Sequence, residues 1–176
     1  MRRVAAQTDQ MVEWRMEPPA GGSKWGHANP RVTAVFRRRA SLVQLRSAGQ
    51  VHDLEAILHD VNQRYFAGTV SDVLITWGRK TKPRVEQRTS IKLGSYSATE
   101  RLVRIHPVLD QRWVPRYFVQ YIVYHELLHH LVPEAKVAGR TLLHPPEFQR
   151  RERDFQQINR ALAWEQKHID RLLRWR

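Results

Sequence analysis

The sequence contains no cysteine, and this absence excludes several classes of protein at once. Without thiols the chain has no disulfide scaffold, no zinc ribbon and no cysteine nucleophile. It also lacks any apolar run that approaches the roughly 18–20 residues of a membrane-spanning helix. The first residues, MRRVAAQTDQMVEW, are basic but have no apolar stretch behind them, so they do not resemble a secretory signal. We therefore expect a cytoplasmic protein that does not bind a membrane.

Acidic residues are scarce, since 17 Asp and Glu stand against 30 Lys and Arg and give a net charge of +13. Such an excess favours an acidic partner, most often nucleic acid, and here DNA bound through the basic ends of the chain. A simpler interpretation, that these arginines only keep the protein in solution, remains equally open. Two clusters of arginine are the candidates for phosphate contacts: Arg37, Arg38 and Arg39, and Arg150, Arg151 and Arg153.

Length and composition predict one folded domain preceded by a tail. With 176 residues, of which 41% are hydrophobic, the chain is long enough for one core but short for two. Residues 1–40 are rich in proline, glycine and polar side chains and have no periodic apolar pattern, so we expect a basic, disordered tail. Residues 41–176 then form the domain, which we expect to end in a basic C-terminal helix.

The first half of the domain shows both helical and strand periodicity. Apolar residues recur at helical spacing over residues 53–67, which predicts an amphipathic helix. Apolar residues typical of strands occur over residues 73–77, around residues 91–93, and over Leu102–Ile105. Because these strands follow one another so closely, we expect a small antiparallel three-stranded sheet.

The second half predicts two more helices. Residues 117–132 are almost continuously apolar or aromatic, so this helix should be buried on most sides. After a loop over residues 133–143, apolar side chains across residues 148–172 follow one face of a long helix. The expected fold class is therefore α+β, with the sheet packed on the N-terminal helix and on the buried helix, and with a long C-terminal helix.

The buried helix carries the segment YHELLHHLVP, which holds three histidines and a glutamate. His125 and His129 are four residues apart, so on a helix both imidazoles lie on one face and can share one metal ion. Glu126 lies beside them, where its carboxylate can take a proton from a zinc-activated water without being a ligand. His130 points roughly 140° away from His125 and is not expected to join them. Burying these groups in so apolar a helix is costly without a partner, which favours a metal over ordinary core histidines.

A third ligand is needed, because a catalytic zinc site uses three protein ligands and leaves one position open. The candidates downstream are His144, Glu134, Glu147 and Glu152. Glu134 follows His129 too closely for the chain to turn back. His144 precedes the segment PPEF, where a new helix is expected to start, and neutral imidazole is the commonest metal ligand. His144 is therefore favoured, with Glu147 or Glu152 as the alternative.

The chain resembles the SprT-like family of zinc metallopeptidases, whose eukaryotic relatives include the Spartan DNA–protein crosslink protease. The likeness covers roughly residues 51–155 and lies in the ordered segments VNQRYFAGTV, VLITWG, LGSYSATERLVRIHPVL, HELLHH and HPPEF. It implies a minigluzincin-like fold and Zn²⁺ as the cofactor. It also implies that His125, His129 and His144 are the zinc ligands and that Glu126 is the catalytic base. The chain departs from the family where Pro145 replaces the glycine that usually follows the third histidine.

The function favoured by these features is that of a zinc metalloendopeptidase, a hydrolase that cleaves peptide bonds in a protein or peptide substrate, with DNA-associated proteins as one class of substrate. An extended substrate is expected to add as a strand to the sheet edge above the active-site helix. A nucleic-acid-binding protein with a structural zinc site is the alternative, although such a site has no use for Glu126. A zinc hydrolase that acts on small amides would share every motif.

Overall fold

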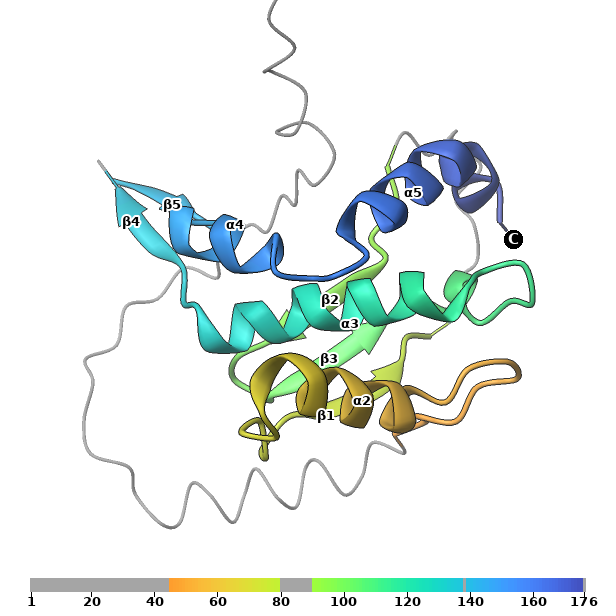
Figure 1. The fold of residues 1–176 in the computed structure, drawn as a ribbon, viewed down its shortest axis with the longest axis horizontal. Coiled ribbons are helices and arrows are strands. Elements are labelled where there is room, and N and C mark those ends of the chain that lie inside the picture. Colours follow the sequence, from red (N-terminus) through yellow and green to blue (C-terminus); the bar gives the residue numbers. More distant parts are fainter. Residues whose placement is uncertain (1–44, 80–89, 138, 176) are drawn as a thin grey trace, which may run out of the picture.

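The computed structural model describes residues 45–79, 90–137 and 139–175 of the chain. The tail predicted for residues 1–40, with Arg37, Arg38 and Arg39, lies outside the described residues. Figure 1 shows the arrangement, in which helix α3 runs through the middle with α2 on one side and α4 and α5 on the other. No helix in the described part of the chain is long and apolar enough to cross a membrane.

Helix α2 (Leu54–Phe66) confirms the first predicted helix. The Asp53 carboxylate accepts hydrogen bonds from two backbone N–H groups of the first turn, as an N-cap residue should. The helix ends at Ala67, which adopts a left-handed conformation with φ 50°. Its inner face packs on α3 and on strand β1 (Leu74–Trp77). The buried residues of this face are Leu54, Ile57 and Val61.

The sheet is mixed, so the prediction of a wholly antiparallel sheet is wrong in one of its two pairings. Strands β2 (Gly94–Ser97) and β3 (Leu102–Ile105) form the expected antiparallel hairpin, whereas β1 pairs parallel with β3 in the order β1-β3-β2. Three of the four side chains of β3 are buried, which explains why β3 takes the central position of this three-stranded sheet. The long stretch between β1 and β3 supplies the connection that a parallel pair requires. β2, with the sequence GSYS, is left at an edge of the sheet.

Helix α3 (Arg116–Leu131) is the buried helix expected from its sequence. It begins directly after Pro115. Ten of its 16 residues are buried, on several faces at once, because α2, β2, β3, α4 and α5 all pack against it. His125 and Glu126 are among those ten. The first half of the predicted metal-binding segment therefore lies in the core, whereas His129 and His130 are half-buried.

The loop predicted for residues 133–143 contains a two-stranded antiparallel hairpin, β4 (Ala135–Val137) and β5 (Arg140–Leu142). Its side chains are mostly exposed, so no alternation of buried and exposed residues marked these strands in the sequence. The hairpin lies beyond the C-terminal end of α3 and leads directly to the start of α4 (Figure 1). It thus carries the chain back from His129 to His144.

The single C-terminal helix expected across residues 148–172 is two helices, α4 (Pro146–Glu152) and α5 (Ile158–Leu173). Tight turns interrupt them, with hydrogen bonds from the Asp154 N–H to the Arg151 carbonyl and from the Phe155 N–H to the Glu152 carbonyl. Phe155 lies in this interruption, where it packs among three tyrosines of α2 and α3 and is almost fully buried. The remaining helix, α5, is the long C-terminal helix of the prediction.

Candidate metal centre

Three imidazoles converge at one point on α3. His125 and His129 lie one turn apart on this helix, and His144 approaches them from the residues just before α4. The ring centroids form a nearly equilateral triangle with sides of 5.0, 5.1 and 4.9 Å. One nitrogen atom from each ring lies within 4.8 Å of the other two. The structure therefore brings together the three residues that the sequence predicted as metal ligands.

The chemistry of this donor set fits zinc. Two zinc-bound nitrogens in a tetrahedral site lie roughly 3.3 Å apart, since each Zn–N bond is about 2.0–2.1 Å. The Nε2 atoms of His129 and His144 lie 3.2 Å apart. Burial is the main cause that lowers the pKa of His129 to about 3, so its imidazole is neutral and keeps a lone pair. Three imidazoles form one of the donor sets of catalytic zinc sites, which keep one position open.

Phe148 forms the apolar wall behind the three imidazoles. It lies on α4 and is fully buried, and its ring centroid lies 5.0, 4.7 and 4.5 Å from those of His125, His129 and His144. This contact limits the orientations that the three rings can adopt. Phe148 belongs to the segment HPPEF, whose hydrophobic residue the sequence marked only as part of a helix face.

Glu126 is 4% exposed and lies against the first residue of the edge strand β2. A Cβ atom at Gly94 would come within 2.5 Å of Glu126 Oε1, so only glycine allows this approach. The backbone of Tyr96, two residues further along β2, donates a hydrogen bond to the carboxylate. Burial raises the pKa of Glu126 to about 7, against the opposing influence of His125, Lys92 and this hydrogen bond. The predicted base is thus a buried carboxylate held between α3 and β2.

Glu152, an alternative ligand in the sequence, contacts a histidine instead. Its Oε1 atom lies 2.7 Å from Nδ1 of His125 and accepts a hydrogen bond of 3.0 Å from the Tyr121 hydroxyl. Burial lowers the pKa of His125, but the hydrogen bond to Glu152 and the nearby carboxylates outweigh this influence and place the pKa above its ordinary value. For Glu152 burial has the opposite effect and raises the pKa. The contact with His125 outweighs burial, so the pKa of Glu152 lies below its ordinary value. The two groups therefore stabilise each other's charged forms.

His130 does not take part in the triangle, in agreement with its angle on the helix. Its Nδ1 atom is 2.7 Å from the Tyr96 hydroxyl, and its Nε2 atom is 3.5 Å from a carboxylate oxygen of Asp72. These contacts tie the C-terminal turn of α3 to β2 and to the residues before β1. His130 therefore helps to fix the edge strand beside the metal centre.

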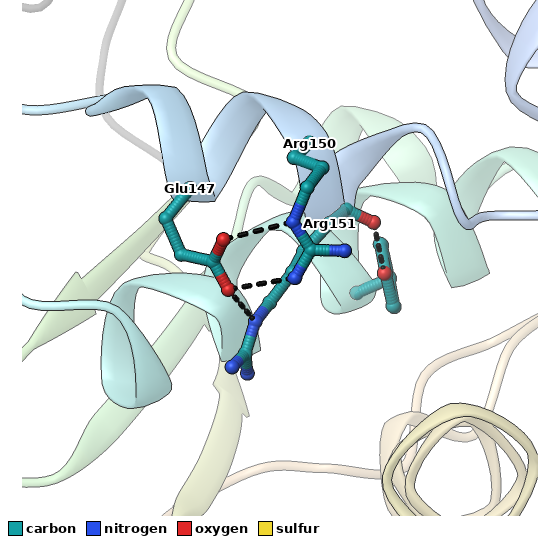
Figure 2. A network of polar contacts seen from close by, with 4 residues as sticks. Glu147, Arg150 and Arg151 are labelled. Carbon is teal, nitrogen blue, oxygen red and sulfur yellow. Dashed lines mark hydrogen bonds and ion pairs between the residues drawn. The ribbon is translucent and has the colours of Figure 1, made fainter.

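Glu147 and the arginines of α4 form a separate surface network, shown in Figure 2. One carboxylate oxygen of Glu147 accepts from Arg150 at 2.8 Å and from Arg151 at 2.7 Å, and the other accepts from Arg150 at 2.9 Å. These hydrogen bonds lower the pKa of Glu147 to about 2. Glu147 is thus committed to its own helix and is not among the groups that converge with the histidines in the described residues. Arg153 is exposed at the end of α4.

The sequence did not single out Gly94, Phe148 or the role of Glu152. All three act across contacts between elements far apart in the chain, so no local spacing marks them. The only signal in the sequence was position: Gly94 belongs to LGSYS, Phe148 belongs to HPPEF, and Glu152 follows Phe148 by one helical turn.

No family model matches the sequence, and no curated protein matches it. Among solved structures, the chain is similar to the crystal structure of the metallopeptidase zymogen of Methanocaldococcus jannaschii jannalysin. The sequences are 19% identical, the match covers 69% of this chain and 98% of that chain, and the TM-score is 0.47.

Proposed function

We propose that this protein is a zinc-dependent metallopeptidase of the SprT-like type, which hydrolyses peptide bonds in a protein or peptide substrate. One observation supports this function above the others. Three imidazoles with nitrogens within 4.8 Å of one another lie beside a carboxylate that is 4% exposed and adjacent to one of them in sequence. A structural zinc site requires the imidazoles but has no need of the buried carboxylate.

The residues divide into ligands and a base. His125, His129 and His144 would hold the ion, and bound zinc supplies a Lewis acid that polarises a carbonyl and lowers the pKa of water. Glu126 accepts the proton of the attacking water and passes it to the departing amine. Gly94 and the backbone N–H of Tyr96 fix the position of the Glu126 carboxylate. Because these partners belong to β2, the geometry of the edge strand controls the geometry of the base.

The edge position of β2 supports an extended peptide as the substrate. The strand order β1-β3-β2 leaves one side of β2 without a strand partner among the described residues. A peptide that pairs with this side adds one strand to the sheet and is held through its backbone. Since Gly94 of β2 lies against Glu126, such a peptide would pass directly by the base. A small amide would gain nothing from this edge.

The proposal is tested by exchanging Glu126 for an isosteric amide. Glu126→Gln should keep its zinc and its melting temperature while losing about 10²–10⁴-fold in turnover of an unfolded protein such as casein, because only the general base is removed. Glu134→Gln, a change at an exposed carboxylate just after α3, is the matched control and should keep full activity. Full activity of Glu126→Gln would refute the mechanism. Cleavage of small amides but not of casein would favour the small-amide hydrolase.

DNA remains a proposed partner, which would make DNA-associated proteins the natural substrates. The net charge of +13 supports it, and the described residues add a cavity of about 590 Å³ at the end of α5. Its lining includes two tryptophans and two arginines, and the Arg171 guanidinium lies 4.1 Å from the ring centroid of Trp113. The two arginines could contact phosphates, whereas the Trp113 ring is already stacked on Trp164 and Asp170 also lines the cavity. A phosphate that approached Arg150 or Arg151 would compete with Glu147 for them.

A further inference from the structure

We propose that Glu152 is a positioning residue of the metal centre, which orients the His125 imidazole and fixes its tautomer so that Nε2 is presented to the ion. This inference rests on the proposed zinc site and adds a residue to it. Glu152 is the last residue of α4, so its role also links the C-terminal part of the chain to the ligands on α3.

The contact with His125 determines which ring nitrogen carries a proton. An ionised carboxylate can only accept hydrogen bonds, so Nδ1 of His125, 2.7 Å from Glu152 Oε1, must be the donor. Nε2 is then the nitrogen that remains for a metal. A histidine ligand held in this way by a carboxylate is oriented and made more basic, which strengthens its bond to the ion.

The surroundings of Glu152 suit a fixed partner rather than a ligand. Oε1 receives a second hydrogen bond from the Tyr121 hydroxyl, which lies one helical turn before His125 on α3. The side chain is 21% exposed, so water competes little for these contacts. Among the described residues, the group that converges closely enough to hold one ion comprises the three histidines and does not include Glu152.

The local fold explains how Glu152 reaches His125. Phe148, one turn earlier on α4, is fully buried against the three imidazoles and sets the face that α4 turns toward α3. The interruption after Glu152 then ends α4 before the chain turns into α5. Phe155, in this interruption, is almost fully buried against Tyr124 of α3 and so anchors the segment that follows Glu152.

The test compares zinc affinity, measured by competition with a chelator, across a set of variants of the full chain. Glu152→Ala should bind zinc about 10–100-fold more weakly than the wild type, which is the usual effect of removing such a partner. Glu152→Gln keeps the shape and one accepting oxygen, so its loss should be smaller. Glu147→Ala, an exposed change on the same helix, is the matched control and should bind zinc as the wild type does. Melting temperatures of the metal-free proteins identify any variant that fails to fold.

A second readout follows the proton itself. In ¹H–¹⁵N NMR spectra of the zinc-loaded protein, His125 should show a protonated Nδ1, and Glu152→Ala should change the exchange of that proton. Unaltered zinc affinity in Glu152→Ala would overturn the positioning role alone. Loss of all zinc in both Glu152 variants, as expected for a true ligand, would also overturn it. Failure of the wild-type chain to bind zinc would instead overturn the proposed function.

Discussion

Gly94→Ala should abolish the proposed peptidase activity without weakening zinc binding. The new Cβ atom would lie 2.5 Å from Oε1 and 2.9 Å from Cγ of Glu126, and 2.9 Å from Cγ2 of Ile122. Carbon atoms in contact normally lie about 3.5–4.0 Å apart, so the overlap is on the order of 1 Å. Both Glu126 and Ile122 would have to give way, and the carboxylate of Glu126 meets the new atom at the shortest distance. A displacement of this size in a catalytic group costs on the order of 10²-fold in rate.

The same change should lower the free energy of unfolding by about 1–3 kcal/mol, as an extra methyl group in a packed core usually does. The assay therefore combines turnover of an unfolded protein, zinc content and denaturant unfolding. Gly78→Ala is the matched control, because its Cβ atom would meet its nearest heavy atoms at 3.4 and 3.7 Å and should be tolerated. Wild-type turnover by Gly94→Ala would refute the account of how Glu126 is positioned. Loss of zinc would show that the change acts on the ligands instead.

Three further predictions concern stability and partners. Asp110 accepts hydrogen bonds from the backbone N–H groups of Gln50, Val51 and His52, so Asp110→Ala should lower the free energy of unfolding by about 1–2 kcal/mol after allowance for solvent exposure. Burial raises the pKa of Asp110, but these hydrogen bonds outweigh burial and hold the pKa below its ordinary value. The stabilisation is therefore present above the unfolded pKa of about 3.9 and is lost as the pH falls through the folded pKa. Chemical denaturation between pH 3 and 7 measures this loss. Removal of zinc with a chelator should lower the melting temperature, because the proposed ion would join α3 to the start of α4, and the shift should be absent in His144→Ala. Removal of residues 1–40 should leave casein cleavage intact but weaken DNA binding and flatten the salt dependence of that binding, as measured by fluorescence anisotropy. If the intact protein has no DNA affinity even at low salt, the nucleic-acid partner is excluded.

The parts of the site that depend on local spacing could be predicted from the sequence. A separation of four residues on an apolar helix is enough to place His125 and His129 on one face, and the same geometry excluded His130. Asp53 at the start of α2 likewise marked a helix boundary that the structure confirms. Such features follow from the pitch of one helix and need no knowledge of the tertiary fold.

The parts that depend on contacts between elements could not be predicted in the same way. The parallel pairing of β1 with β3 reflects competition among strands for the buried centre of the sheet, which no single strand sequence encodes. Glu152 was considered as a ligand because it is a carboxylate at a suitable distance along the chain. Only the packing of α4 on α3 shows that it reaches Nδ1 of His125. The approach of Gly94 to Glu126 joins strand β2 to a helix and leaves no local pattern.

Metal analysis of purified variants shows whether the imidazoles of His125, His129 and His144 hold one zinc ion. The wild-type chain should contain one zinc per molecule, and His144→Ala should lose most of it. Glu147→Ala should retain the full amount, because its carboxylate is occupied by Arg150 and Arg151 at the surface. A His144→Ala protein that keeps its zinc, or a Glu147→Ala protein that loses it, would show that the three histidines are not the ligand set.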